Sequence, residues 1–336
     1  MGNLMAYSAI VTKIKAMERW RLTDQQFEEM AELENVPEAV AYLKENPSYE
    51  TLFSSFSQDD LHRGKIEQQL NQALYRDFMR IYRFANLRQR RFLELYFRRS
   101  ELSILKTCLR SIAGGMEQEL NLEEFGTFFQ QHSRLELRQL CQKQTVEQWI
   151  ANLKGSSYYA PLAALEQKGA VSPTDCETVL DMAYFQSSWR INKRYLKKDE
   201  QKIITQCFGT RMDMLNIQWI YRAKKYYGLS GAQIISILIP IRFHLTRDQI
   251  TRMAQAESLD EFFSILKTTH YGKMDLSETP DLKKIADQIN DRVYEMTRKS
   301  DPYSIAALNS YLYFKEKEIR RIITTLERIR YGVAAV

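Results

Sequence analysis

Proline and glycine are scarce in this chain. Only 7 prolines and 12 glycines occur among 336 residues, too few for a sheet-rich fold built from many tight turns. The abundant residues are Leu, Glu, Gln, Lys, Arg, Ala and Met, which are the residue types that form helices best. No stretch alternates apolar and polar residues as a half-buried strand would. The composition therefore predicts an all-α protein.

Patterns that hold metal ions or build disulfide frameworks are missing as well. The four cysteines lie at least 31 residues apart, at Cys108, Cys141, Cys176 and Cys207. The four histidines have no second ligand three or four residues on, and they lie at His62, His132, His244 and His270. The pair Asp59-Asp60 lies in a polar stretch, where a solvated or helix-capping pair is the better interpretation. We therefore expect reduced, buried thiols and no metal site.

The chain also has no long apolar run. The longest, from Ile234 to Ile241, is about half the length that a membrane span requires. A core helix that ends near Pro240 explains it. The first residues lack the basic segment and apolar core of a signal peptide, and Ala6 stands where a myristoylation site has Ser or Thr. We expect no membrane-spanning segment.

Catalytic and cofactor-binding motifs are absent from the sequence. No glycine-rich phosphate loop is present, and Gly114-Gly115 is an isolated pair at a predicted helix end. No nucleophile, general base or ligand set stands out. We expect no catalytic residues, no cofactor, no bound nucleotide and no small-molecule substrate. The net charge of +6, from 48 basic and 42 acidic residues, allows an acidic partner or an anionic membrane surface but is too modest for a nucleic-acid arm.

What the chain does have is one pattern repeated three times. Each copy opens with a hydroxyl residue followed three positions later by Gln or Glu, which is the capping box that begins a helix. An apolar stripe with helical spacing follows, and then a Leu-Lys pair and a tyrosine. The capping pairs and tyrosines are Thr23, Gln26 and Tyr49; Ser133, Glu136 and Tyr158; and Thr246, Gln249 and Tyr271. The pattern predicts three similar units, each about one third of the chain.

Two longer amphipathic helices complete each copy, and the second carries a recurring carboxylate. These carboxylates are Glu101, Asp213 and Glu318. They could face a central space enclosed by the three units and serve a function there. Alternatively, each pairs with a nearby base such as Arg98, Arg211 or Lys315, and this second interpretation is favoured. Glycines at Gly114-Gly115 and after Tyr227 break long helical patterns and predict three helical repeat domains, 1–113, 114–226 and 227–336.

One helix is rich in arginine and aromatic residues, over residues 83–99. Such a mixture is typical of nucleic-acid-binding surfaces, so an all-α scaffold or RNA-binding protein is the alternative function. The aromatic residues also have helical spacing, with Phe92, Leu95 and Tyr96 on one side. A solvated basic face above a buried apolar one is therefore the favoured interpretation, with no nucleic-acid partner.

The order of several motifs resembles a known family. The helix from Tyr7 to Met17 is followed by Arg21-Leu22-Thr23, and later helices carry Tyr96-Phe97-x-x-x-Glu101 and Asp213-Met214-Leu215-Asn216-Ile217. The end of the chain runs from Asp301-Pro302-Tyr303 to Lys315-Glu316-x-Glu318. Across essentially the whole chain these motifs look like the C subunit of the V/A-type (vacuolar-type) ATPases, the family of the eukaryotic V-ATPase d subunit.

This resemblance implies three similar helical domains arranged as a pseudo-threefold funnel. The protein would be a non-catalytic central-stalk protein, peripheral on the cytoplasmic face of the membrane. Its partners would be the membrane rotor ring and the D- and F-type shaft subunits. It would transmit torque for proton or sodium transport coupled to ATP, and the apolar segment at Ile234 would be a candidate contact with the ring.

Overall fold

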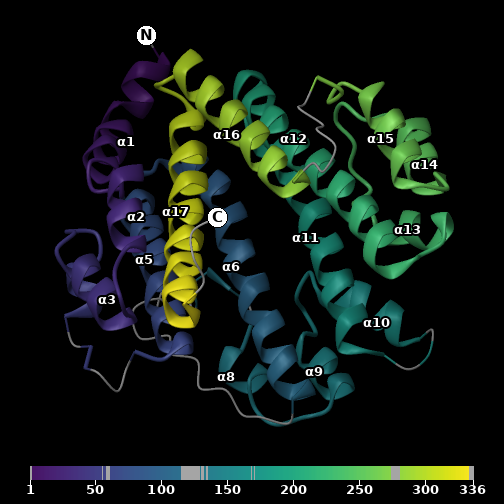
Figure 1. Ribbon diagram of the computed structural model, residues 1–336, viewed down its shortest axis with the longest axis horizontal. Coiled ribbons are helices and arrows are strands. Elements are labelled where there is room, and N and C mark those ends of the chain that lie inside the picture. The colour runs from purple at the N-terminus through teal and green to yellow at the C-terminus, as the bar shows by residue number, and fades with distance from the viewer. Residues whose placement is uncertain are drawn as a thin grey trace. The chain divides into compact units, whose positions relative to one another are not determined.

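The structure is a computed structural model that describes residues 2–54, 56–57, 61–114, 129, 132–133, 135–167, 169, 171–273 and 281–332. Helices dominate, and no described residue lies in a β-strand, so the predicted all-α class is confirmed (Figure 1). The helices are α1 (Gly2–Glu18), α2 (Asp24–Ala31), α3 (Val36–Lys44), α4 (Glu50–Phe53), α5 (Arg63–Phe84), α6 (Leu87–Ala113), α8 (Leu137–Leu140), α9 (Val146–Asn152), α10 (Tyr159–Glu166), α11 (Pro173–Tyr195), α12 (Lys198–Arg222), the π-helical turn η2 (Ala223–Tyr227), α13 (Gly231–Ile237), α14 (Arg247–Gln255), α15 (Leu259–Lys267), α16 (Leu282–Ser300) and α17 (Ile305–Tyr331).

The capping boxes are confirmed in the first and third repeats. The Thr23 hydroxyl accepts a hydrogen bond from the Gln26 amide at 3.2 Å, while the Gln26 side chain accepts one from the Thr23 amide at 3.0 Å. Thr246 and Gln249 do the same at the start of α14. Each box satisfies amides that the first helical turn leaves without partners. The two sequence signals therefore mark true helix starts.

The prediction of a capping box at Ser133 is wrong. The helix there, α8, is only four residues long, and its N-cap residue is Glu136, which makes no side-chain capping bond. The box of this repeat lies one helix later, between Thr145 and Gln148 at the start of α9. The Ser133 hydroxyl donates instead to the Glu101 carboxylate, and this long-range contact takes the place of a local cap.

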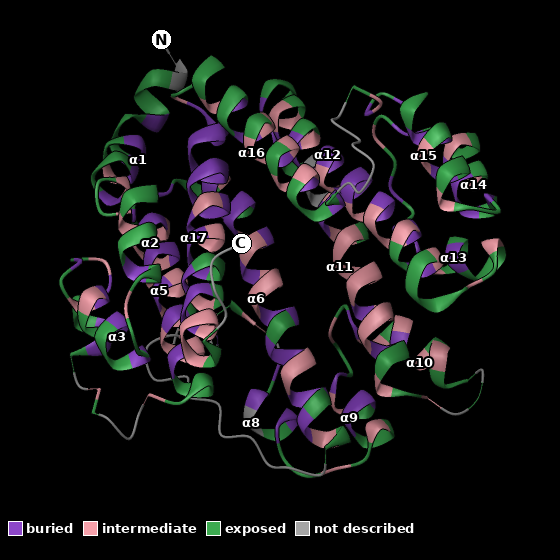
Figure 2. Ribbon diagram, in the orientation of Figure 1, coloured by how far each residue is buried: buried purple, intermediate pink, exposed green. Residues whose placement is uncertain are grey.

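The chain forms two compact units. The first combines residues 1–90 with residues 298–336. In it, α17 packs along α5 and also contacts α1, α2 and α3. All residues from 304 to 313 are buried (Figure 2), so the start of α17 is enclosed on all sides. The apolar core comprises Leu22, Phe27, Met30, Val36, Ala39, Val40, Leu43, Tyr49, Leu52, Phe53, Ile66, Leu70, Ala73, Ile319, Ile322 and Leu326.

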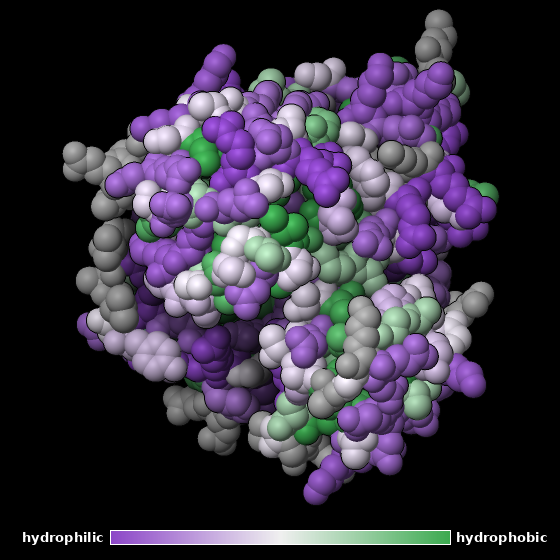
Figure 3. Space-filling view, turned by 90° about the vertical axis from the view of Figure 1, so that its right-hand side faces the viewer, coloured by the Kyte–Doolittle hydropathy of each residue, from purple (hydrophilic) through white to green (hydrophobic). Residues whose placement is uncertain are grey.

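The second unit is drawn from residues 91–297. Its largest described core joins the end of α12 to α13, α14, α15 and α16, around Met253, Phe262 and Leu266. The segment beginning at Ile234 belongs to this core, because Ile234 and Leu238 are buried in it. The expectation of a core helix is therefore confirmed, although the helix ends at Ile237 rather than at Pro240. Hydrophilic atoms dominate the face that carries α13–α15, with hydrophobic atoms in smaller groups between them (Figure 3).

Glycines end two of the long helices, as expected. The helix α6 ends at Ala113 next to Gly114, and η2 ends at Gly228, whose φ of +56° lies in the left-handed region that favours glycine. No helix among the described residues is both long and apolar enough to cross a membrane. The three predicted domains, 1–113, 114–226 and 227–336, stay a prediction.

Candidate functional site

Three buried carboxylates occupy equivalent places on three long helices. Glu101 lies on α6, Asp213 on α12 and Glu318 on α17. Their relative exposures are 8%, 0% and 4%. A buried carboxylate is stable only when hydrogen-bond donors or cations surround it. The partners of these three residues therefore show what each one stabilises.

Glu318 lies in a network that contains two cations. The Tyr49 hydroxyl donates to its Oε1 at 2.6 Å, and the Lys315 ammonium donates to the same oxygen at 3.2 Å. The Arg21 guanidinium donates to Oε2 at 3.2 Å, and the Leu22 amide lies 3.4 Å from Oε1. The Lys315 side chain is itself 1% exposed. Glu318 thus holds α17 against the segment that leads into α2 and against the start of α4.

Asp213 is surrounded mainly by backbone amides. The amides of Phe243, His244 and Leu245 donate to its two oxygens at 3.2, 2.7 and 3.2 Å. The Tyr271 hydroxyl donates at 2.9 Å. These bonds hold α12 against the segment before α14 and against the residues after α15.

A glycine on α12 allows this close approach. A Cβ atom at Gly209 would lie 2.4 Å from Cγ of the Phe243 ring, which is far inside van der Waals contact. Phe243 can pack against α12 only because position 209 has no side chain. Gly209 therefore helps to place the amides that bind Asp213.

Glu101 follows the same plan with a different set of donors. The Tyr158 hydroxyl donates to Oε2 at 2.7 Å, and the Ser133 hydroxyl donates to Oε1. Ser133 also accepts a hydrogen bond from the Leu135 amide at 3.1 Å. This carboxylate holds α6 against the segment before α8 and against the start of α10.

We call each carboxylate with its tyrosine a carboxylate clamp, namely Glu318–Tyr49, Glu101–Tyr158 and Asp213–Tyr271. The partner tyrosine always belongs to the next repeat: Glu101 of the first repeat binds Tyr158 of the second, and Asp213 of the second binds Tyr271 of the third. Glu318 of the third repeat binds Tyr49 of the first. The three repeats are thus linked in a closed cycle, with each clamp inside one unit.

Burial shifts the pKa of two clamp carboxylates and of all three clamp tyrosines. It raises the pKa of Glu101 and of Asp213, and the hydrogen bonds that these carboxylates accept oppose the rise. Burial, followed by the adjacent carboxylate, also raises the pKa of Tyr49, Tyr158 and Tyr271. Each tyrosine therefore stays protonated and acts as a donor.

The contacts of each carboxylate bear on the two interpretations made from the sequence. A nearby base does pair with Glu318, as Lys315 shows, and the Arg98 charge acts on Glu101. The hydrogen bonds of Asp213 come instead from backbone amides and Tyr271. All three groups are buried and hydrogen-bonded within their own unit, and the interpretation that they face a space enclosed by the three repeats stays a prediction. Burial by the following repeat is a tertiary contact that helical spacing does not encode.

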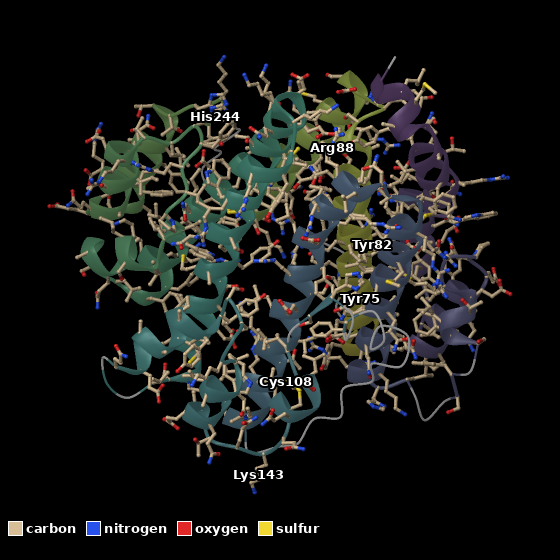
Figure 4. The ribbon with its side chains drawn as sticks, turned by 180° about the vertical axis from the view of Figure 1, so that it is seen from behind. Tyr75, Tyr82, Arg88, Cys108, Lys143 and His244 are labelled. Carbon is tan, nitrogen blue, oxygen red and sulfur yellow. A yellow bond between two sulfur atoms is a disulfide. The ribbon has the colours of Figure 1, made fainter. Side chains whose placement is uncertain are left out.

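The arginine-rich stretch over residues 83–99 exposes the ring of Phe84, at 52%, while its other aromatic rings are half-buried or buried. Phe92 and Leu95 are fully buried, and the Arg90 guanidinium stacks 4.9 Å from the centre of the Tyr82 ring. Arg91 forms an ion pair with Glu94 at 3.0 Å. Tyr82 and Arg88 are labelled in Figure 4. Stacking on a nucleic acid requires accessible aromatic faces, so the predicted basic face above a buried apolar one is the better description.

Two separate pairs of residues meet that the sequence analysis does not predict. One is a pair of histidines and the other a pair of cysteines. The rings of His244 and His270 stack with centroids 3.8 Å apart, and burial lowers the pKa of His244. Cys108 and Cys141 form a disulfide, with their Cα atoms 5.0 Å apart. The prediction of reduced thiols is wrong for this pair. Cys108 lies near the end of α6 and Cys141 directly follows α8, so their separation of 33 residues gives no local signal of the contact. Figure 4 labels His244 and Cys108.

The other two cysteines, Cys176 and Cys207, are buried thiols outside the disulfide, as expected, and the Cys207 sulfur lies 3.6 Å from the Thr297 hydroxyl. Burial raises the pKa of Cys176 to about 11, so its thiol is unreactive at neutral pH. In the described part of the chain, no three metal-ligating side chains come close enough to hold an ion. Asp59 and Asp60 lie outside the described residues.

Comparison with known proteins gives a consistent result. Residues 10–335 match the ATP synthase (C/AC39) subunit family. The A-type ATP synthase C subunit of Thermococcus kodakarensis is 25% identical over 97% of this chain and 87% of its own length. Its counterparts in Desulfurococcus sp. strain SY and Methanothermobacter thermautotrophicus are 26% and 22% identical, over 97% and 90% of this chain. These two matches cover 88% and 78% of the relatives' own lengths. The chain therefore belongs to the ATP synthase (C/AC39) subunit family and is a subunit of a rotary ATPase.

Proposed function

We propose that this chain is the non-catalytic central-stalk protein that links the shaft of the soluble head to the membrane rotor ring. The observation that carries this proposal is the family match over residues 10–335. Its partners would be the ring subunits and the D- and F-type shaft subunits, and its place the cytoplasmic face of the membrane as a peripheral protein. It would transmit torque between ATP turnover and proton or sodium transport.

The mechanical role fits the way the helices are held together. A torque-bearing adaptor must resist deformation, and close-packed helices have low compressibility. Packing alone allows helices to slide past each other, whereas a buried carboxylate that binds a tyrosine in another repeat fixes their register. The Glu318 clamp adds buried ionic contacts from Lys315 and Arg21. Within this proposal the repeats form three domains, 1–113, 114–226 and 227–336, of a pseudo-threefold funnel.

Purification of the tagged native protein from membranes in mild detergent tests the assembly. Mass spectrometry should find the ring subunits and both shaft subunits in the same complex. Recovery of the chain alone, or with RNA, would contradict the proposal and favour the RNA-binding alternative.

A clamp variant tests the mechanical part separately. In the intact complex, Glu318→Gln should lower ATP-driven ion pumping more than ATP hydrolysis, because a softer adaptor loses coupling. Asp248→Ala is the matched control, since its carboxylate is 76% exposed and lies 3.9 Å from Arg252. Equal loss of pumping and hydrolysis would show that the clamp has no part in coupling.

A further inference from the structure

Two histidine rings join the two segments that hold Asp213. His244 lies in the segment before α14, and His270 lies among the residues that follow α15 (Figure 4 labels His244). Their rings stack with centroids 3.8 Å apart and an angle of 17° between the ring planes. The His244 amide and the hydroxyl of Tyr271, which directly follows His270, both donate to the Asp213 carboxylate. The stack and the clamp therefore connect the same two segments of the chain.

The corresponding place in the first repeat carries a permanent cation. His244 and Arg21 each lie two positions before the threonine that caps the next helix. The Arg21 guanidinium donates to Glu318 at 3.2 Å, and a guanidinium is always charged in a protein. An imidazole, by contrast, gains and loses its charge close to neutral pH. The Asp213–Tyr271 clamp is thus built beside a group whose charge depends on the pH of the medium.

Partial burial and a like charge oppose the protonation of His244. The Phe243 ring lies close to it, with centroids 3.9 Å apart, although solvent still reaches both histidines. Burial, followed by the charge of His270, lowers the pKa of His244, and the Asp213 carboxylate only partly offsets this. The clamp is therefore fully stabilised above the ordinary histidine pKa of 6.5, and it loses stability as the pH falls below that value.

The other ionisable residues of the two segments keep one charge state in this pH range. Tyr271 stays neutral because burial raises its pKa. Arg242, Arg247 and Lys273 are exposed cations, and side chains of these two types titrate well above neutral pH. Within the two segments, the charge that changes near neutral pH is therefore that of the histidine pair.

We propose that the His244–His270 stack is an acid-sensitive release for the Asp213–Tyr271 clamp. While at least one ring is neutral, the stack holds the two segments together and keeps their donors on Asp213. When both rings are protonated, two cations face each other with centroids 3.8 Å apart and repel. The segments then separate, and the three amides that bind Asp213 lose their acceptor. The proposal does not depend on the role of the chain in torque transmission.

Hydrogen exchange of the full-length chain tests the release. Mass spectrometry follows peptides that contain the amides of Phe243, His244 and Leu245 at about pH 7.5 and about pH 5.5, after correction for the intrinsic pH dependence of exchange. Protection of these amides should fall at least about threefold at the lower pH, because the open state binds protons more readily. The Leu22 amide, which donates to Glu318, should keep its protection. Unchanged protection at the three amides, or an equal fall at Leu22, would overturn the proposal.

Variants connect the pH response to the histidine pair. His244→Phe and His270→Phe each keep an aromatic ring in the stack and remove one of its two charges, so each should abolish most of the fall in protection. Asp213 is unchanged in both, so its own titration cancels in the comparison with the wild type. His62→Phe, at an exposed histidine of the first unit, is the matched control and should respond as the wild type does.

Circular dichroism establishes that each variant is folded, and either of the two stack variants is sufficient if the other does not fold. A full wild-type response in His270→Phe would show that burial of His244 alone causes the loss of protection. That result would overturn the role of the pair.

Discussion

The clamps at Glu318 and Asp213 perform the same task with different chemistry. Glu318 is balanced by Lys315 and Arg21, whereas Asp213 is balanced by three backbone amides. In both, a tyrosine hydroxyl from the next repeat completes the set. The geometry of the contact is therefore shared among the repeats, while the means of compensating the buried charge differs. A buried carboxylate needs donors, and either side chains or backbone can supply them.

The largest effect on stability should come from breaking the Glu318–Tyr49 clamp, which contains the buried ionic contacts. Replacing Glu318 with Ala leaves the Lys315 charge buried without its carboxylate, and we expect the free energy of unfolding to fall by about 4 kcal/mol. Urea denaturation followed by circular dichroism measures the loss.

A double variant separates charge from shape. In Lys315→Met with Glu318→Gln both charges are removed together, so at least half of the loss should be recovered. If the double variant is no more stable than Glu318→Ala, the buried charge is not the cause.

Breaking the Asp213–Tyr271 clamp, in which backbone amides bind the carboxylate, should lower the stability somewhat less. Asp213→Ala leaves the amides of Phe243, His244 and Leu245 without their acceptor, and we expect a loss of about 3 kcal/mol. Hydrogen exchange should show faster exchange at these three amides. The exposed Asp248→Ala should change stability by less than about 0.5 kcal/mol. Unchanged exchange at the three amides would refute this account of the clamp.

Removing the tyrosine hydroxyls compares all three clamps with one change. Tyr49→Phe, Tyr158→Phe and Tyr271→Phe should each cost about 2 kcal/mol, because each hydroxyl donates to a buried carboxylate. Tyr49→Phe should cost the most, since its hydroxyl also accepts from Lys315 at 2.8 Å. Tyr227→Phe, at a residue that is 72% exposed, serves as the control in the same denaturation series. Equal losses for all four variants would contradict the clamp geometry.

The smallest effect concerns pH and the Glu101 clamp. Burial raises the pKa of Glu101 above its ordinary value of 4.5, so the folded state holds this proton more tightly than the unfolded state. The stabilisation that comes from this tighter proton binding is fully present below pH 4.5. It is lost as the pH rises through the raised pKa of Glu101. The stability advantage of the wild type over Glu101→Gln should therefore shrink with rising pH.

Denaturation of both proteins from about pH 4 to about pH 7 measures this trend. Glu147 provides the opposite case, because its own backbone amide and the Thr145 hydroxyl lower its pKa. The difference in the free energy of unfolding between the wild type and Glu147→Gln should not shrink as the pH rises. An advantage over Glu101→Gln that grows with pH would place the folded pKa of Glu101 below its ordinary value.

The sequence predicts local structure well and the clamps only in part. Capping boxes at Thr23 and Thr246 are visible because both partners lie within one helical turn. The tyrosines and the carboxylates each recur visibly, yet nothing in their spacing says that Glu101 binds Tyr158. That pairing depends on how whole helices pack. The same reason explains the misassigned cap at Ser133 and the disulfide between Cys108 and Cys141.

The contact between Glu318 and Tyr49 sets an order of events during synthesis. The ribosome must add 269 residues after Tyr49 before Glu318 exists, which at ordinary elongation rates takes on the order of 10 to 50 s. Until then, Leu22, Phe27 and Met30 lack the helix that covers them. The first unit can therefore complete its core only after α17 has been synthesised, and its apolar surface stays uncovered until then.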